Sequence, residues 1–234
     1  MMLPRDRLIV ALDVPSVEEA TALIETLGDS VGVYKIGLEL LFAGGIELAR
    51  VLAHSGRPVF VDAKLLDIEA TVERATAAIA RSGAAFLTVH ALDQKTLGAA
   101  VRGRGDSTLK LLGVTVLTNL APSDLIEQGI DHPLAELALH RAKLAKQAGI
   151  DGVIASGHEA ARIREATGPD FLIVTPGVRP QGSASDDQAR AVTPRLAIEA
   201  GADYLVVGRP ITRAPDPREA AYAIAGEIAA ALAG

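Results

Sequence analysis

The sequence contains no cysteine, and only 3% of its 234 residues are aromatic. The lack of cysteine excludes disulfides, thiolate catalysis and metal centres held by cysteine. Basic residues are outnumbered by acidic ones, 23 to 29, which gives a formal net charge of -6. Nucleic-acid binding needs a basic surface and often stacking rings, so no nucleic-acid partner is expected.

Long apolar runs are also missing. No stretch reaches the roughly 18 residues of a membrane span. The N-terminal "MMLPRDRLIVALDVPS" has too short an apolar core for a signal peptide and no small-residue cleavage site. With 49% hydrophobic and 22% charged residues, the composition is that of an ordinary globular protein. We therefore expect a cytoplasmic protein with no membrane partner.

Short apolar segments alternate along the chain with stretches rich in Ala, Leu, Glu and Arg at helical spacing. The apolar segments predict strands at 7–13, 31–37, 58–64, 84–91, 109–117, 152–156, 171–177 and 203–209. Nearly continuous apolar strands separated by helices are typical of a parallel sheet covered on both faces. Eight such units in this length predict a single α/β domain over residues 1–234, a closed (β/α)8 TIM barrel.

The alternative to a barrel is an open doubly wound sheet. A dinucleotide-binding sheet of that kind would carry a glycine-rich fingerprint after its first strand, where this chain reads "DVPSVEEA". The stretch "LELLFAGGIELARVLAHSG" is interpreted as helical, and several helical stretches close with glycine. The longest connection, 118–151, holds "APSDLIEQGI" before a helical segment and predicts a short extra helix.

Polar residues recur where the predicted strands end. In barrels the chemistry gathers at the C-terminal ends of the strands, so these side chains are expected to meet. So many polar residues at equivalent positions are hard to assign to helix capping alone. They are Asp13, Lys35, Asp62, Lys64, His90, Thr118, Ser156, Arg179 and Arg209.

The stretch "VFVDAKLLDIEATV" concentrates charge at the end of the third predicted strand. Asp62 and Lys64 are two apart, so both side chains point to one face. Lys35 ends the neighbouring strand, and Asp67 could add a second negative charge. One interpretation is a structural ion-pair network. The other is a positioned proton donor, because a lysine between acids stays protonated and can act as a general acid.

The last third of the chain indicates a phosphate site. The loops after strands seven and eight often bind phosphate in barrels. The first of these loops, "RPQGSASDDQ", runs from Arg179 to Gln188, and the second holds Gly208 and Arg209. Glycine lets backbone N–H groups approach an anion, and arginine pairs with it. Gly-Arg after one strand is common by chance, so the hypothesis depends on both loops together.

The ordered pieces "LIVALDVPS", "YKIGLEL", "DAKLLDIEAT", "VTVLT", "TPGVRP", "DDQ" and "DYLVVGRPIT" resemble the orotidine 5'-phosphate decarboxylase family over almost the whole chain. The resemblance implies a homodimer of (β/α)8 barrels that converts the nucleotide orotidine 5'-monophosphate (OMP) to UMP and CO₂. It also implies that the enzyme uses no metal and no organic cofactor.

The resemblance also implies a role for each matching residue. Lys35, Asp62, Lys64 and Asp67 would form a charged tetrad, with Lys64 as the proton donor. Asp67 would come from the partner across the dimer interface, with Thr71 beside it. The substrate contacts implied are Asp13 and Lys35 for the ribose, Thr118 for the pyrimidine, and Arg179, Gln188, Gly208 and Arg209 for the phosphate.

The chain departs from the family pattern at a few positions. Glu69 and Ala70 replace the usual proline and asparagine in "DIEAT", Asn119 stands where serine is common, and "LDQKT" replaces a glycine-rich turn. His90 is interpreted as a core histidine rather than a catalytic one. "HEAAR" at 158–162 lacks the second histidine of a zinc motif.

Three alternatives to the decarboxylase remain open. One is a magnesium-dependent sugar-phosphate enzyme of the same superfamily, which would have an acidic residue in the second strand, where this chain reads "YKIG". The second is a catalytically silent phosphate-binding barrel. The third is a retro-aldol enzyme, whose Schiff-base lysine would want an apolar or cationic setting.

Overall fold

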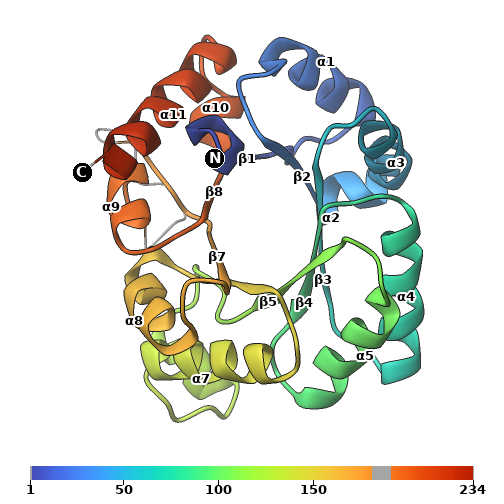
Figure 1. Ribbon diagram of the computed structural model, residues 1–234, viewed down its shortest axis with the longest axis vertical. Coiled ribbons are helices and arrows are strands. Elements are labelled where there is room, and N and C mark those ends of the chain that lie inside the picture. Colours follow the sequence, from blue (N-terminus) through green and yellow to red (C-terminus); the bar gives the residue numbers. More distant parts are fainter. Residues whose placement is uncertain (1, 181–190, 234) are drawn as a thin grey trace.

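The computed structural model describes residues 2–180 and 191–233. Eight strands form a closed barrel in chain order, and each pairs in parallel with its neighbours (Figure 1). The predicted (β/α)8 barrel is thereby confirmed, and the open sheet is excluded. The strands are β1 (Leu8–Ala11), β2 (Val33–Gly37), β3 (Val59–Leu65), β4 (Phe86–His90), β5 (Lys110–Val114), β6 (Gly152–Ile154), β7 (Leu172–Thr175) and β8 (Tyr204–Val207).

Helices surround the barrel in a ring (Figure 1). Within residues 2–180 and 191–233, no helix combines the length and apolar character needed to cross a membrane. The helical elements are η1 (Pro4–Arg7), α1 (Val17–Leu27), α2 (Leu38–Leu40), η2 (Leu41–Gly45), α3 (Ile46–His54), α4 (Glu69–Arg81), α5 (Gln94–Arg104), α6 (Pro122–Glu127), α7 (Leu134–Gln147), α8 (Gly157–Thr167), α9 (Pro194–Glu199), α10 (Arg209–Thr212) and α11 (Pro217–Ala233).

Two details of the helices bear on the predictions. The extra helix expected in the longest connection is α6. The stretch interpreted as helical from residue 38 is broken into α2, η2 and α3, because Gly44 adopts a φ of 96° inside it. Only glycine takes that conformation readily, so the chain turns there instead of continuing as one helix.

Apolar side chains form one core outside the barrel and another inside it. The outer core lies between strands and helices and includes Leu8, Val10 and Ile36. The inner core includes Phe60 and Phe86, whose rings meet edge to face with centroids 6.0 Å apart. Because side chains alternate along a strand, the inner residues share a face with the residue two positions further on. The inner core therefore forms an apolar floor beneath the side chains at the C-terminal ends of the strands.

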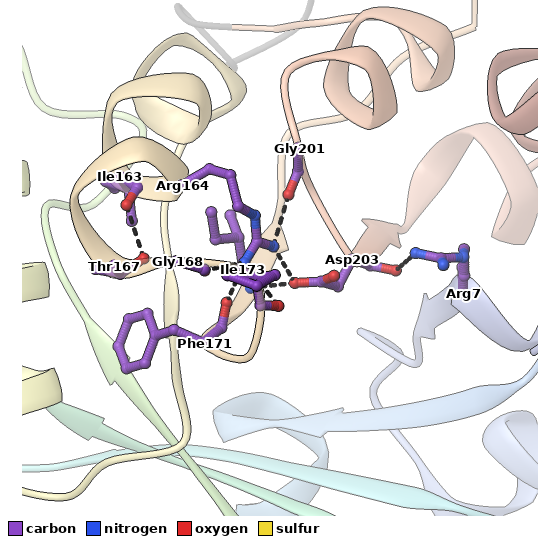
Figure 2. A network of polar contacts seen from close by, with 10 residues as sticks. Arg7, Ile163, Arg164, Thr167, Gly168, Phe171, Ile173, Gly201 and Asp203 are labelled. Atoms are coloured by element: carbon purple, nitrogen blue, oxygen red, sulfur yellow. Dashed lines mark hydrogen bonds and ion pairs between the residues drawn. The ribbon is translucent and has the colours of Figure 1, made fainter. Parts of the chain in front are cut away.

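A polar network lies at the opposite, N-terminal end of β7 and β8 (Figure 2). Arg164 on α8 pairs with Asp203 at 2.6 Å and donates to the carbonyl oxygens of Phe171 and Gly201. The same Asp203 oxygen accepts a hydrogen bond from the N–H group of Ile173 at 2.8 Å. One arginine thus joins α8 to the starts of β7 and β8, and this keeps the far ends of those strands in fixed places.

Candidate active site

A cavity of about 490 Å³ opens at the C-terminal ends of the strands. Most of the predicted site residues line it, together with Glu39, Phe60 and Asn119, which were not assigned to the site from the sequence. The predicted residues in its wall are Asp13, Lys35, Asp62, Lys64, Thr118, Arg179, Gly208 and Arg209.

Strand geometry places the charged residues directly above the apolar floor. Val33 and Phe60 belong to the inner core. Lys35 follows Val33 by two residues, and Asp62 and Lys64 follow Phe60 by two and four, so all three can point inward. The neighbouring strands also align Lys35 with Phe60 and Gly37 with Asp62. Two adjacent strands therefore deliver both lysines and the aspartate to one side of the cavity.

The charges alternate in a continuous chain of ion pairs. Lys35 Nζ lies 3.1 Å from Asp13 Oδ1 and 3.4 Å from Asp62 Oδ2. Lys64 Nζ lies 2.9 Å from the same Asp62 oxygen. The side chains of Lys35 and Asp62 are only 9% and 12% exposed, whereas Lys64 keeps 29%. Buried charges of one sign would be expensive to desolvate, and this alternation offsets that expense.

Asp62 is held as a carboxylate. Burial alone would raise its pKa, but the ammonium groups of Lys35 and Lys64 and hydrogen bonds from Lys64 and Thr88 together lower it. Opposite charges at this distance favour the ionised form. At neutral pH the aspartate therefore carries a full negative charge between two lysines.

Lys64 has a strained backbone. Its φ of 48° is the one positive value among the non-glycine residues in the described part of the chain. The strand pairing is irregular at the same place, where β3 shifts register against β4 between Val61 and Leu65. Left-handed backbone at a non-glycine residue costs about 1–3 kcal/mol and is concentrated at functional sites. The surrounding barrel therefore holds Lys64 where its own backbone preference would not place it.

The other side of the cavity carries the arginines. Arg179 follows β7, while Gly208 follows β8 and precedes Arg209, the first residue of α10. A Cβ at Gly208 would find its nearest neighbour, Ala11 Cβ, at an ordinary 3.6 Å. Packing within the chain thus leaves this part of the wall open to a ligand. Gln188, the other predicted phosphate residue, lies outside the described residues.

Asp67 and Thr71 lie apart from the lysine cluster. Both are exposed, and Asp67 Oδ1 accepts a hydrogen bond from the N–H group of Ile68 at 2.6 Å. Asp67 lines a second, more open depression together with Leu66, Ile68 and Asp93. Within one chain the fourth charge of the expected tetrad is therefore not in the cavity, and its delivery by a partner stays a prediction.

Two polar strand ends do not line the cavity. Ser156 caps α8, where its hydroxyl oxygen accepts a hydrogen bond from the N–H group of His158 at 3.4 Å. His90 is partly buried on β4, and its pKa is lowered by burial first and then by the positive charges of Lys64 and Arg141. An imidazole of lowered pKa is uncharged at neutral pH.

Two of the departures from the family pattern, Glu69 and Asn119, can be located relative to the site. Glu69 begins α4 and pairs with Arg102 on α5 at 3.2 Å, beside a second pair between Arg102 and Glu73 at 2.8 Å. These are exposed pairs and contribute little stability. Asn119 lines the cavity next to Thr118. Neither departure displaces a member of the charged chain.

Among residues 2–180 and 191–233, no three His, Asp or Glu side chains gather as they would around a metal ion. The expectation that the protein needs no metal stays a prediction.

The fold and the cavity define a (β/α)8-barrel protein with a charged cavity at the C-terminal face of the barrel, where the active sites of such barrels lie. The "Orotidine 5'-phosphate decarboxylase / HUMPS family" matches residues 6–224. The chain belongs to this family. The predicted family resemblance and the prediction that the chain is an enzyme are thereby confirmed.

Individual relatives cover nearly the whole chain. A protein named orotidine 5'-phosphate decarboxylase from Rhodopseudomonas palustris (strain BisB5) is 55% identical over 227 residues, which are 97% of this chain and 96% of that protein. One of the same name from Caulobacter sp. (strain K31) is 55% identical over 223 residues, 95% and 97% of the two chains. The crystal structure of orotidine 5'-phosphate decarboxylase from Lactobacillus acidophilus is 40% identical with a TM-score of 0.83 and covers 94% and 98%.

Proposed function

We propose that this protein decarboxylates OMP to UMP and CO₂ in de novo pyrimidine biosynthesis, and we expect it in the cytoplasm. The observation that carries the proposal is the alternating chain of Asp13, Lys35, Asp62 and Lys64 inside a cavity whose other wall holds Arg179 and Arg209. Family membership and relatives of that name supply the reaction.

The substrate would bind with its phosphate toward the arginines. Arg179, Arg209, Gln188 and the backbone at Gly208 would bind the phosphate, since guanidinium groups and glycine-exposed N–H groups suit that anion. Asp13 and Lys35 would hold the ribose hydroxyl groups, and Thr118 would contact the pyrimidine. This orientation brings the reacting carbon, C6 of the ring, toward Lys64. Phosphate binding, remote from C6, would supply free energy for excluding water.

The chemical step breaks the bond between C6 and the carboxylate carbon. The electron pair of that bond stays on C6 as CO₂ leaves. The Lys64 ammonium group would stabilise this charge while it develops and then give C6 a proton, which makes UMP. Lys64 afterwards regains a proton from solvent. A donor fixed in place before the reaction needs no reorganisation during it, which is the main source of such stabilisation.

Asp62 has two roles in this proposal. Its carboxylate keeps Lys64 oriented at 2.9 Å. It would also lie beside the substrate carboxylate that departs as CO₂. Repulsion between the two is a weaker argument for rate than the preorganised charge around C6.

The remaining features of the proposal are a metal-free reaction and a dimer. Lys64 supplies the positive charge that a Lewis acid would otherwise provide, so the proposed step uses no metal and no cofactor. Lys35 occupies β2, where the magnesium-dependent relatives would have an acidic ligand, and it is already paired with two carboxylates. Exposed Asp67 and Thr71 would reach the site of the second protomer in a homodimer.

An absorbance assay tests the proposed function. Purified protein should bleach the absorption band of the orotate ring when mixed with OMP, and EDTA should leave the rate unchanged. An unchanged band would reject the decarboxylase. Bleaching that EDTA abolishes would keep the decarboxylase but reject the metal-free reaction. Borohydride trapping distinguishes the Schiff-base alternative, which would form a covalent adduct.

A further inference from the structure

Thr88 lies in the middle of β4, fully buried, and is not among the residues that line the cavity. Nothing in the proposed reaction gives it a task. We propose that Thr88 is a positioning residue, whose hydroxyl group holds the Asp62 carboxylate and the Lys64 backbone in the arrangement that the reaction uses. This inference rests on the proposed function, because it is that reaction which Lys64 and Asp62 would serve.

The irregular pairing of β3 with β4 creates a need for such a group. Val61 pairs with Leu87, but the next pair is Leu65 with Val89. Three residues of β3, 62–64, therefore lie opposite Thr88 alone. A regular ladder cannot satisfy the backbone of a strand that has extra residues, so one of the freed groups needs another partner.

The Thr88 hydroxyl supplies that partner. The Lys64 N–H group donates to Thr88 Oγ1 at 2.9 Å, and Thr88 Oγ1 donates to Asp62 Oδ1 at 2.8 Å. A hydroxyl has one hydrogen to donate and lone pairs to accept, so the two bonds fit one group without conflict. Linked hydrogen bonds polarise and strengthen each other in a setting of low dielectric.

Because the Thr88 hydroxyl binds one oxygen of the Asp62 carboxylate, the two oxygens have different partners. Oδ1 of Asp62 accepts a hydrogen bond from Thr88, while Oδ2 forms ion pairs with both ammonium groups, at 2.9 Å from Lys64 and 3.4 Å from Lys35. Binding at both oxygens fixes the plane of the carboxylate. Without the hydroxyl, the carboxylate could rotate, and the Lys64 N–H group would lose its partner at a backbone position that is already strained.

If Thr88 only filled space, the loss of its hydroxyl group would not affect turnover. Valine has nearly the shape of threonine but cannot make either bond, whereas serine keeps the hydroxyl and loses a methyl group. Thr88→Val and Thr88→Ser are therefore matched variants. We expect Thr88→Val to lower kcat by about ten- to hundredfold, as the loss of a hydrogen bond to a charged group would. Thr88→Ser should restore most of kcat, and UMP affinity should be unchanged in both.

A second measurement does not depend on activity. The charged and titratable groups around Asp62 are Lys35 from β2, Lys64 from β3 and His90 from β4, with Asp13 beyond Lys35. All of them are kept in the Thr88 variants. Removing the hydroxyl removes one of the contacts that lower the pKa of Asp62, so its carboxyl ¹³C signal should titrate at higher pH in Thr88→Val than in wild type and Thr88→Ser.

The outcomes distinguish this inference from the proposed function. Wild-type protein that fails to bleach OMP rejects the function, while the NMR titration still tests Thr88. An Asp62 titration that is the same in wild type and Thr88→Val, or a kcat that falls equally in Thr88→Val and Thr88→Ser, overturns the positioning role. If circular dichroism shows that Thr88→Val does not fold, Thr88→Ala takes its place in the same comparison.

Discussion

Replacing Lys64 with alanine removes its Nζ atom, which is proposed to contribute to catalysis in two ways. Lys64 Nζ would stabilise the charge on C6 and would then donate the proton that replaces CO₂. General acid catalysis contributes about 10²–10⁴-fold, and one preorganised donor to a developing charge about 10²–10³-fold. We therefore expect Lys64→Ala to reduce kcat by about 10⁴-fold or more, a value consistent with the lower ends of both ranges taken together.

The same substitution should leave the fold intact. Asp62 keeps Lys35 at 3.4 Å and the hydroxyl of Thr88 at 2.8 Å, so its charge is not left alone. Alanine would also inherit the left-handed backbone, so the strain at this position would stay. We expect the free energy of unfolding to change by about 1–2 kcal/mol, which is typical of a single substitution that leaves no buried charge unpaired.

The assay is the loss of orotate absorbance at saturating OMP, with thermal unfolding measured on the same preparations. Lys143→Ala, which removes an exposed lysine from α7, is the matched control and should keep wild-type activity. A Lys64→Ala protein that is folded and turns over within tenfold of wild type (about 1.4 kcal/mol of barrier) would refute the assignment of Lys64 as the proton donor.

Three further predictions address other parts of the site. Arg209→Ala should weaken UMP binding with little effect on unfolding, and unchanged affinity in calorimetry would reject the phosphate assignment. Mixing inactive Lys64→Ala with inactive Asp67→Ala should restore some activity, because a hybrid dimer can hold one complete site; no recovery after confirmed subunit exchange would mean that Asp67 acts within its own chain. Gly37→Ala should lower kcat/KM, since its Cβ would lie 2.9 Å from Asp13 Oδ1 and 3.0 Å from Lys35 Nζ and would disturb the ion pair between them; wild-type kinetics would show that the Asp13–Lys35 pair has no part in binding.

Much of the fold could be predicted from sequence because its signals are local. An apolar run such as 84–91 predicts a buried strand from its own residues, and eight runs at regular spacing predict closure. The break at Gly44 was missed although Gly44 and Gly45 form a glycine pair, which is a turn signal, because the apolar spacing on both sides of the pair was interpreted as one helix. Strand ends were placed too late by a few residues, as in 109–117 against Lys110–Val114, because the apolar run continues into the cavity wall.

The charged site could also be predicted from local spacing, but the prediction missed Thr88. The spacing of Asp62 and Lys64 already fixes their shared face, and Lys35 follows from the parallel order of the strands. Thr88 could not be recognised, since its role depends on a register shift that only the three-dimensional pairing reveals. The alternation Phe86, Thr88, His90 was the one available signal, because it places a polar side chain on the inward face of β4.

The left-handed conformation of Lys64 has a consequence for engineering. A search for thermostable variants that follows backbone preference alone would choose glycine at residue 64, because glycine adopts a φ of 48° without penalty. Such a variant would relieve the backbone strain and would lose the proposed proton donor. Relief of backbone strain and turnover are therefore opposed at this residue, and a selection that measured only melting temperature would not detect the loss of the proposed proton donor.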